Sequence, residues 1–309
     1  MSQNKANRRN SGSIGPYEHL PFTFAQYSVA CERHPQRNED SITVAPRSGM
    51  AAVFDGVGGS AAGEIASQTA ARATLLAWKH AFRQRHPAFK GPMFLEECSK
   101  IDLCQLLPKI LLQADALVRS EGAQRAGTDD LATTVALAAF CHNPASHDFS
   151  MVYAHVGDSR IYLLRQHEPL KSLTIDDGLL GRLVENQMVS NEDARRIDQA
   201  MHADQLSDAE FNYFRLRGGI TQALGGPVPP TIHIDQTSIL PGDRILLCTD
   251  GIHDNLIEDE IEEILRKSPR TSAARLLVEH AILRSRQERY ITVRAKPDDM
   301  SAIVITRRF

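Results

Sequence analysis

The stretch Met50–Gly59, MAAVFDGVGG, joins five apolar residues directly to an acid and a glycine-rich turn. Two later stretches repeat this arrangement, Tyr153–Asp158 (YAHVGD) and Ile245–Asp250 (ILLCTD). Short apolar runs bounded by turn residues are typical of buried strands. If the three strands are neighbours in the core, their acids converge at one edge of a sheet.

The order of the expected elements indicates the fold class. Further strands are expected at Phe24–Ala30, Ser41–Val44, Ala132–Phe140, Arg160–Arg165 and Ser301–Thr306. Helices are expected at Ala62–Arg85, Leu103–Ser120, Ile257–Arg266 and Thr271–Arg286. Strands come in adjacent pairs and do not alternate with helices. This order favours antiparallel sheets with helices packed outside, an α+β layered domain.

Composition excludes several classes of protein. The 309 residues carry a net charge of −3, so no basic excess favours nucleic acid. No apolar run reaches the roughly 20 residues of a membrane span. Five scattered cysteines without a CxxC pair fit reduced thiols. We expect a cytoplasmic protein with a disordered tail at residues 1–21 and a folded domain at 22–309.

Residues 176–217 differ from the rest of the chain. They are polar and charged, with only weak helical patterns, and they separate the strand at 160–165 from the strands that follow. Long insertions of this kind are often lids or binding segments. A surface excursion without a functional role is the alternative.

Acids beside turns or strand ends occur in five segments: Asn38–Asp40, Asp55–Gly59, Gly157–Arg160, Thr249–Gly251 and Asp298–Asp299. Each alone also fits an ordinary turn, because Asp bonds to nearby backbone and Gly tolerates positive φ. Together they indicate more, because crowded carboxylates repel one another unless a cation neutralises them. Oxygen ligands without His or Cys select Mg²⁺ or Mn²⁺. Two such ions can activate a shared water.

In these motifs and their order, the chain resembles the metal-dependent protein phosphatases of the PPM (type 2C) family. The resemblance covers about residues 24–306. Further matching segments are Thr133–Thr134, Leu173–Thr174 and Ile220–Gly225. It implies a four-layer αββα sandwich, two antiparallel sheets flanked by helices, with two Mn²⁺ or Mg²⁺ ions, and sometimes a third, at one sheet edge. It also implies a serine/threonine protein phosphatase that opposes a protein kinase.

The resemblance implies roles for individual residues. Asp55 would bridge both metals, and Gly56 would offer its carbonyl oxygen to one of them. Asp250 and Asp298 would complete the first metal site.

The remaining roles concern the outer parts of the site. Glu39 and Asp40 would hold the water shell of the second metal, and Asp158 would help to bind the third. Residues 176–217 would form the family's flap, which contributes to substrate choice.

Some positions depart from the family pattern. The phosphate-binding arginine of the family lies four residues before the motif Glu, where this chain has Pro35. Arg33 and Arg37 flank that position, and Arg33 is our choice. Val57 stands where many animal members have a histidine. The family's terminal Asp-Asn reads Asp298-Asp299.

Two other functions stay open at this point. A pseudophosphatase would use the same fold for binding or regulation, and a small-phosphoester hydrolase would use the same metals on other substrates. The retained metal carboxylates argue against the first.

Overall fold

A computed structural model describes residues 20–57, 61–83, 102–128, 130–143 and 148–309. Most of the expected tail at 1–21, and Gly58 and Gly59 of the first motif, therefore lie outside the described residues. Within these ranges, no helix is both long enough and apolar enough to cross a lipid bilayer.

The first sheet contains the two ends of the folded chain. Its strands follow the order β1 (Phe22–Val29), β11 (Met300–Arg307), β10 (Arg244–Cys248), β7 (Arg160–Leu164) and β8 (Lys171–Ser172). Every neighbouring pair is antiparallel. The first and last strands of the chain therefore lie side by side.

The second sheet is also antiparallel. Its main path follows β2 (Asp40–Ala45), β3 (Met50–Val57), β5 (Val135–Asn143), β6 (Asp148–Val156) and β9 (His233–Ile239), and β4 (Ala132–Thr133) pairs with the end of β3. The single strand expected at Ala132–Phe140 is thus divided at Thr134.

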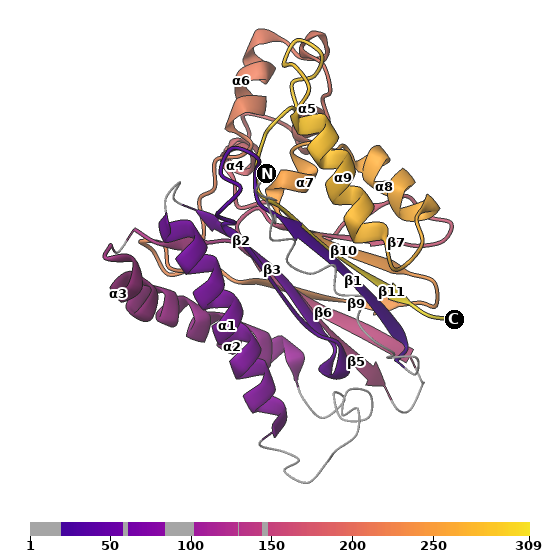
Figure 1. Ribbon diagram of the computed structural model, residues 1–309. Helices are drawn as coiled ribbons and strands as arrows, with labels where there is room; N and C mark the ends of the chain where they lie inside the picture. The colour runs from indigo at the N-terminus through magenta and orange to yellow at the C-terminus, as the bar shows by residue number, and fades with distance from the viewer. Residues whose placement is uncertain (1–19, 58–60, 84–101, 129, 144–147) are drawn as a thin grey trace, which may run out of the picture.

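Helices cover the outer face of each sheet (Figure 1). On the second sheet, α1 (Ala61–Arg83) packs against β2 and β3, and α2 (Leu103–Leu117) against β6 and β9. On the first sheet, α9 (Ala273–Ser285) packs against β1 and β11, with α8 (Glu258–Lys267) beside it. These four layers confirm the predicted αββα sandwich.

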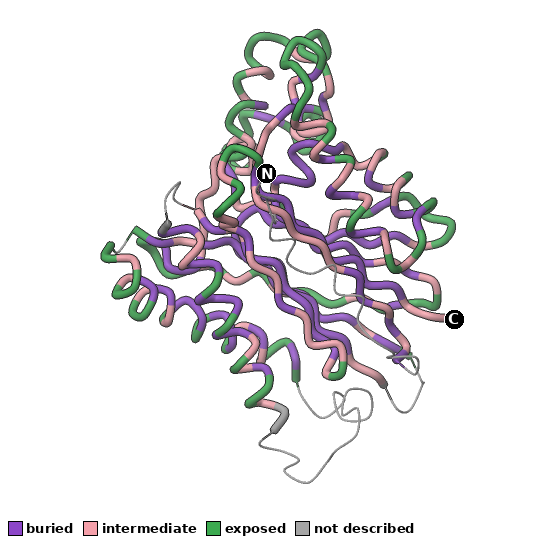
Figure 2. Tube along the Cα trace, in the orientation of Figure 1, coloured by how far each residue is buried: buried purple, intermediate pink, exposed green. Residues whose placement is uncertain are grey.

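The packed faces explain why the strands read as continuous apolar runs. Residues 50–54 of β3 are all fully buried, because one face of the strand meets the other sheet and the other meets helix α1. Between the sheets, the ring centroids of Phe140 and Phe22 lie 4.5 Å apart. Figure 2 shows buried residues along the strands and exposed residues on the outer turns.

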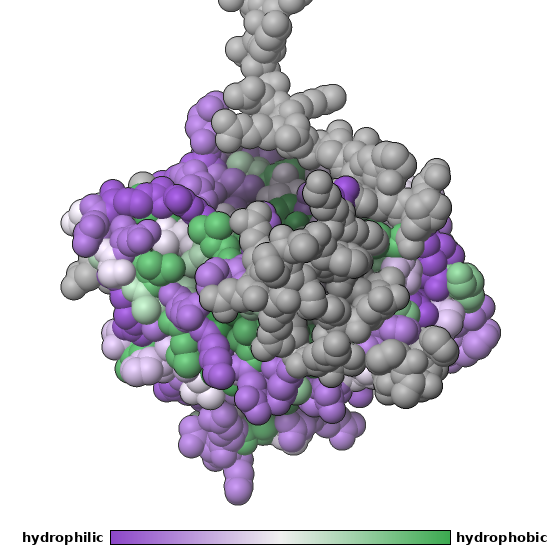
Figure 3. All heavy atoms as spheres, turned by 90° about the horizontal axis from the view of Figure 1, so that it is seen from below, coloured by the Kyte–Doolittle hydropathy of each residue, from purple (hydrophilic) through white to green (hydrophobic). Residues whose placement is uncertain are grey.

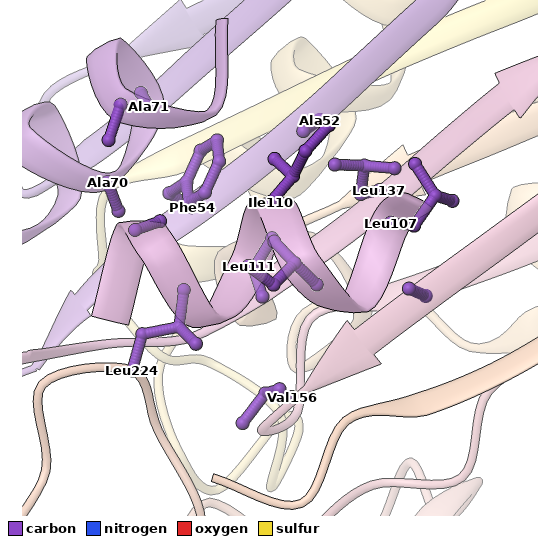
Figure 4. Close-up of a cluster of buried hydrophobic side chains, with 14 of the residues drawn as sticks. Ala52, Phe54, Ala70, Ala71, Leu107, Ile110, Leu111, Leu137, Val156 and Leu224 are labelled. Carbon is purple, nitrogen blue, oxygen red and sulfur yellow. The ribbon is translucent and has the colours of Figure 1, made fainter. Parts of the chain in front are cut away.

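Small residues let α1 approach its sheet closely. Ala62, Ala66, Ala70 and Ala73 recur at helical spacing and are all buried. Helix α2 contributes larger side chains, and Figure 4 shows Leu107, Ile110 and Leu111 directed into this core beside the side chains of β3 and β5.

The insertion forms a small helical subdomain. Helices α4 (Leu179–Glu185), α5 (Asn191–Asp198) and α6 (Asp208–Leu216) enclose their own apolar cluster, which is separate from the main cores. They lie beyond one end of the sandwich in Figure 1. Elsewhere, Figure 3 shows that the described part of the face seen from below mixes polar surface with scattered apolar patches.

Truncating the centre of the inter-sheet core should be costly. We expect Phe140→Ala to lower the free energy of unfolding by about 3–5 kcal/mol, because a fully buried ring leaves a cavity between two rigid sheets. Phe309→Ala is the matched control, since that ring is 82% exposed, and we expect a change within about 0.5 kcal/mol. Denaturant titration measures both, and equal losses would contradict the assigned core.

Candidate active site

Two carboxylates face each other across neighbouring strands of the second sheet. Asp40 begins β2, and the register places it directly opposite Asp55 on β3. Opposed residues in an antiparallel pair are so close that like charges repel. Burial, with the carboxylates of Asp299 and Asp298 nearby, raises the pKa of Asp40 well above its usual range.

The first sheet brings three more acids to the same end. Asp158 lies just before β7, Asp250 just after β10, and Asp298 just before β11, on three adjacent antiparallel strands. Burial raises the pKa of Asp298 to about 7, and the charge of Asp250 adds to the effect. These acids therefore occupy one edge of the sheet, as the sequence predicted.

Asp55 lies close to the acids of both sheets, as the causes of its pKa shift indicate. Burial raises its pKa well above the usual range, and the carboxylates of Asp250, Asp40, Asp298 and Asp158 raise it further. Such charge effects require proximity. The structure thus brings together the five predicted aspartates from both sheets.

Two glycines allow the backbone to approach this cluster. The Gly56 amide donates to the Glu39 carbonyl at 3.0 Å. A Cβ atom on Gly63, in the first turns of α1, would lie 2.8 Å from the Gly56 carbonyl oxygen and 3.0 Å from Glu39 Oε2. A Cβ on Gly56 would lie only 2.1 Å from the Gly63 carbonyl oxygen. A carbonyl and a carboxylate oxygen therefore converge on one point that only glycine leaves open.

Hydroxyl groups and amides fix the acids in place. Thr249 Oγ1 donates to Asp40 Oδ2 at 2.8 Å. The carbonyl of Asp55 accepts from Thr134 N at 2.8 Å and from Thr133 Oγ1 at 2.9 Å. Three threonines thereby hold the side chain of Asp40 and the backbone of Asp55.

Asp299 anchors the loop that carries Glu39. Its two carboxylate oxygens accept from Cys31 N and Glu39 N, each at 2.6 Å. These bonds tie both ends of the segment 31–39 to the start of β11. The carboxylate of Asp299, which this chain has where the family motif has an amide, therefore positions the loop at residues 31–39.

The two candidate arginines differ in their surroundings. Arg33 is exposed, whereas Arg37 Nη2 lies 2.9 Å from Glu39 Oε1. The structure therefore brings Arg37, and not the preferred Arg33, to the edge of the acidic cluster.

A lysine that the sequence analysis did not consider stands among the acids. Lys296 Nζ donates to Asp250 Oδ2 at 2.5 Å and to Asp254 Oδ2 at 2.7 Å, and lies 3.1 Å from Asp298 Oδ2. In the described part of the chain, no group of three His, Cys, Asp or Glu side chains is arranged to hold a metal ion.

The donor chemistry nevertheless fits divalent cations. Every predicted ligand offers oxygen, which hard cations such as Mg²⁺ and Mn²⁺ prefer. Asp40 Oδ1 is buried and has no hydrogen-bond partner among the described residues. Burial is the main cause of the raised pKa values of Asp40, Asp55 and Asp298, and a bound cation would relieve the repulsion that adds to it.

A buried arginine connects the site to the insertion. Arg160, two residues after Asp158, pairs with Asp176 at 2.6 Å and with Asp198 at 3.0 Å. At the other end of the insertion, Arg217 pairs with Asp254 at 3.1 Å. The insertion is thus fastened at both ends to residues adjoining the acidic cluster.

Sequence reasoning missed Lys296, Gly63 and the anchoring role of Asp299. A basic residue two positions before a predicted ligand was a usable signal for Lys296. The closeness of Gly63 to Gly56 depends on how α1 docks, and no local pattern reveals it.

Comparisons with known proteins agree with this geometry. Residues 29–283 match the sequence model of the family described as Protein phosphatase 2C. A relative from Listeria monocytogenes, "Serine/threonine phosphatase stp", is 31% identical over 222 residues, which are 71% of this chain and 72% of that protein. Mycobacterium tuberculosis "Serine/threonine protein phosphatase PstP" is 28% identical over 79% of this chain, but the match spans only 39% of that protein.

Solved structures share the fold. The crystal structure of M. tuberculosis PstP superposes with a TM-score of 0.66 at 26% identity, covering 93% of this chain and 99% of that one. The PstP catalytic domain described in complex with two manganese ions gives a TM-score of 0.64 at 25% identity, with the same coverage. Because residues 29–283 match the sequence model of this family, the chain belongs to the protein phosphatase 2C family.

Proposed function

We propose that this chain is a serine/threonine protein phosphatase that hydrolyses phosphoserine and phosphothreonine at a binuclear Mn²⁺ or Mg²⁺ centre. The observation that carries the proposal is the cluster of five aspartates from both sheets, beside the oxygens of Glu39 and Gly56 that converge at Gly63. The family match and the names of the relatives support it.

We assign the metal-binding roles as follows. Asp55 would bridge the two ions and Gly56 would offer its carbonyl oxygen, with Asp250 and Asp298 at the first ion. Two divalent cations, when bound, lower the pKa of a water molecule and neutralise charge on the phosphoryl group.

The outer roles go to three further acids. Glu39 and Asp40 would hold water molecules at the second ion, and Asp158 would serve a third ion. Thr249 orients the Asp40 carboxylate, and Asp299 fixes the backbone of Glu39. These side chains keep the ligands in place before substrate arrives, which is how a preorganised site lowers a barrier.

We assign phosphate binding to Arg37 instead of Arg33. Arg37 lies at the acidic cluster through Glu39, whereas Arg33 is exposed. A guanidinium group matches two phosphate oxygens at once, which suits it to orienting a phosphoryl group.

The insertion at 176–217 is proposed to act in substrate choice. It carries its own apolar cluster, so it can vary without disturbing the sheets, and Arg160 and Arg217 fasten it beside the acids. We propose phosphorylated proteins as substrates, a cytoplasmic location, and an opposing serine/threonine kinase. Neither alternative function gains support from a specific contact, and the complete carboxylate set argues against a pseudophosphatase.

Activity should depend on added divalent metal. We expect the protein to dephosphorylate a phosphothreonine peptide in Mn²⁺ or Mg²⁺ and to lose that activity in excess EDTA, because oxygen-only sites hold these ions reversibly. A small aryl phosphate assayed in parallel distinguishes protein phosphatase activity from general esterase activity. Full turnover in EDTA, or turnover of the aryl phosphate alone, would overturn the proposal.

Asp55→Asn should abolish activity more completely than any other single carboxylate change. The amide loses a charge shared by both proposed ions, and its nitrogen cannot bind a cation. Stability should change little or rise, because one charge leaves a crowded buried cluster. Turnover at saturating Mn²⁺, beside a thermal unfolding control, measures both. Retention of more than about a tenth of turnover, a deficit below roughly 1.4 kcal/mol, would exclude the bridging role.

The two arginines provide a matched comparison. We expect Arg37→Ala to lower kcat/KM for a phosphopeptide by about 10- to 100-fold, because a charged hydrogen bond to phosphate is lost. Arg33→Ala should stay within about threefold of the parent, as expected for an exposed side chain. The reverse ranking would return the role to Arg33.

A further inference from the structure

Lys296 is a cation that pairs with part of the acidic cluster. It lies two residues before Asp298, and its ammonium group contacts Asp250, Asp254 and Asp298 at 2.5, 2.7 and 3.1 Å. Within the described ranges, no other lysine or arginine forms an ion pair with Asp250 or Asp298. The lysine therefore engages two of the carboxylates that the proposed function assigns to metal.

An ammonium group and a divalent cation cannot share these oxygens. Lys296 donates along the same oxygen lone pairs that a metal would use, and two cations a few Å apart repel strongly in a partly buried site. The lysine side chain is 37% exposed and ends a flexible four-carbon stem, so it can move without disturbing the backbone. Metal binding thus requires displacement of the lysine.

Asp254 makes that displacement possible at low cost. Its Oδ2 already accepts from Lys296 at 2.7 Å, its side chain is 4% exposed, and it is not among the proposed metal ligands. Arg217, at 3.1 Å, holds the same carboxylate in place. The ammonium can therefore stay on Asp254 while Asp250 and Asp298 turn towards an incoming ion.

We propose that Lys296 is a built-in cation that competes with divalent metal for Asp250 and Asp298, and so lowers the metal affinity of the site. In the metal-free protein it holds these carboxylates together, and on loading it is displaced onto Asp254. The inference rests on the proposed function, because it takes Asp250 and Asp298 as metal ligands.

Calorimetric titration with Mn²⁺ tests the competition directly. We expect Lys296→Met to bind Mn²⁺ at least about tenfold more tightly than the parent, because no ion pair has to be broken first. Lys267→Met is the matched control: that lysine pairs with Glu263 on the exposed face of α8, away from the cluster, and its loss should leave the Kd unchanged. An unchanged or weaker affinity in Lys296→Met would overturn the proposal.

Thermal unfolding gives a second readout that needs no catalysis. In EDTA, Lys296→Met should unfold at a lower temperature than the parent, since the acids lose their counter-ion, and the rise on adding Mn²⁺ should be larger. If Lys296→Met does not fold in EDTA, Lys296→Gln replaces it, with the same expectation for the Kd. An equal rise in variant and parent would count against displacement.

The outcomes separate this inference from the proposed function. A parent protein that binds no Mn²⁺ and hydrolyses no phosphopeptide would contradict the proposed function itself. A parent that binds and hydrolyses, with Lys296→Met unchanged in affinity, would contradict only the role of the lysine.

Discussion

Asp40 and Asp55 lie opposite each other on the paired strands β2 and β3. One face of these strands packs against the other sheet, and the other face packs against helix α1. The register holds the two backbones opposite each other, and the Thr249 hydrogen bond holds the Asp40 carboxylate. The acids of the first sheet increase the repulsion at Asp55, and Lys296 pairs with two of those acids, Asp250 and Asp298. Much of the site follows from that repulsion: the threonines, the lysine and the fit to divalent ions all answer a local excess of buried negative charge.

The sandwich makes this excess tolerable. The cluster lies at the end of two antiparallel sheets whose mutual core holds fully buried aliphatic and aromatic side chains. Such cores resist small displacements, so the acids cannot relax by spreading apart. The same rigidity suits catalysis, because ligands held in advance need little reorganisation when charge develops. The insertion is different: it has its own small cluster, and its ties to the sandwich include the ion pairs of Arg160 and Arg217, so it can vary while the acids stay fixed.

The predictable parts of the fold were those in which local pattern and environment agree. Residues 50–54 and 245–248 read as strands because both of their faces are buried, and the Ala-rich α1 read as a helix. Strand β9 was not predicted from the sequence. It lies at a sheet edge and most of its residues are not buried, so no apolar run marks it. The acids of the site were found because each follows or precedes a strand. Gly63 was not, since its position depends on how α1 docks, whereas Lys296 was overlooked although it stands two residues before a predicted ligand.

Two residues at that entry to β11 change the charge in opposite directions. Asp299 adds a carboxylate where the family motif has an amide, and both of its oxygens accept backbone N–H groups from the loop carrying Glu39. Hydrogen bonds from these amides stabilise the Asp299 carboxylate without adding a cation, while its charge adds to the effect of burial in raising the pKa of Asp40. Lys296, three residues earlier, supplies positive charge where the proposed metal ligands lie. The short segment between them therefore places an anion that orders the loop and a cation that restrains the ligands. Because both act on the same cluster, the affinity for metal depends on the two together, and a variant at either position should be interpreted with the other in view.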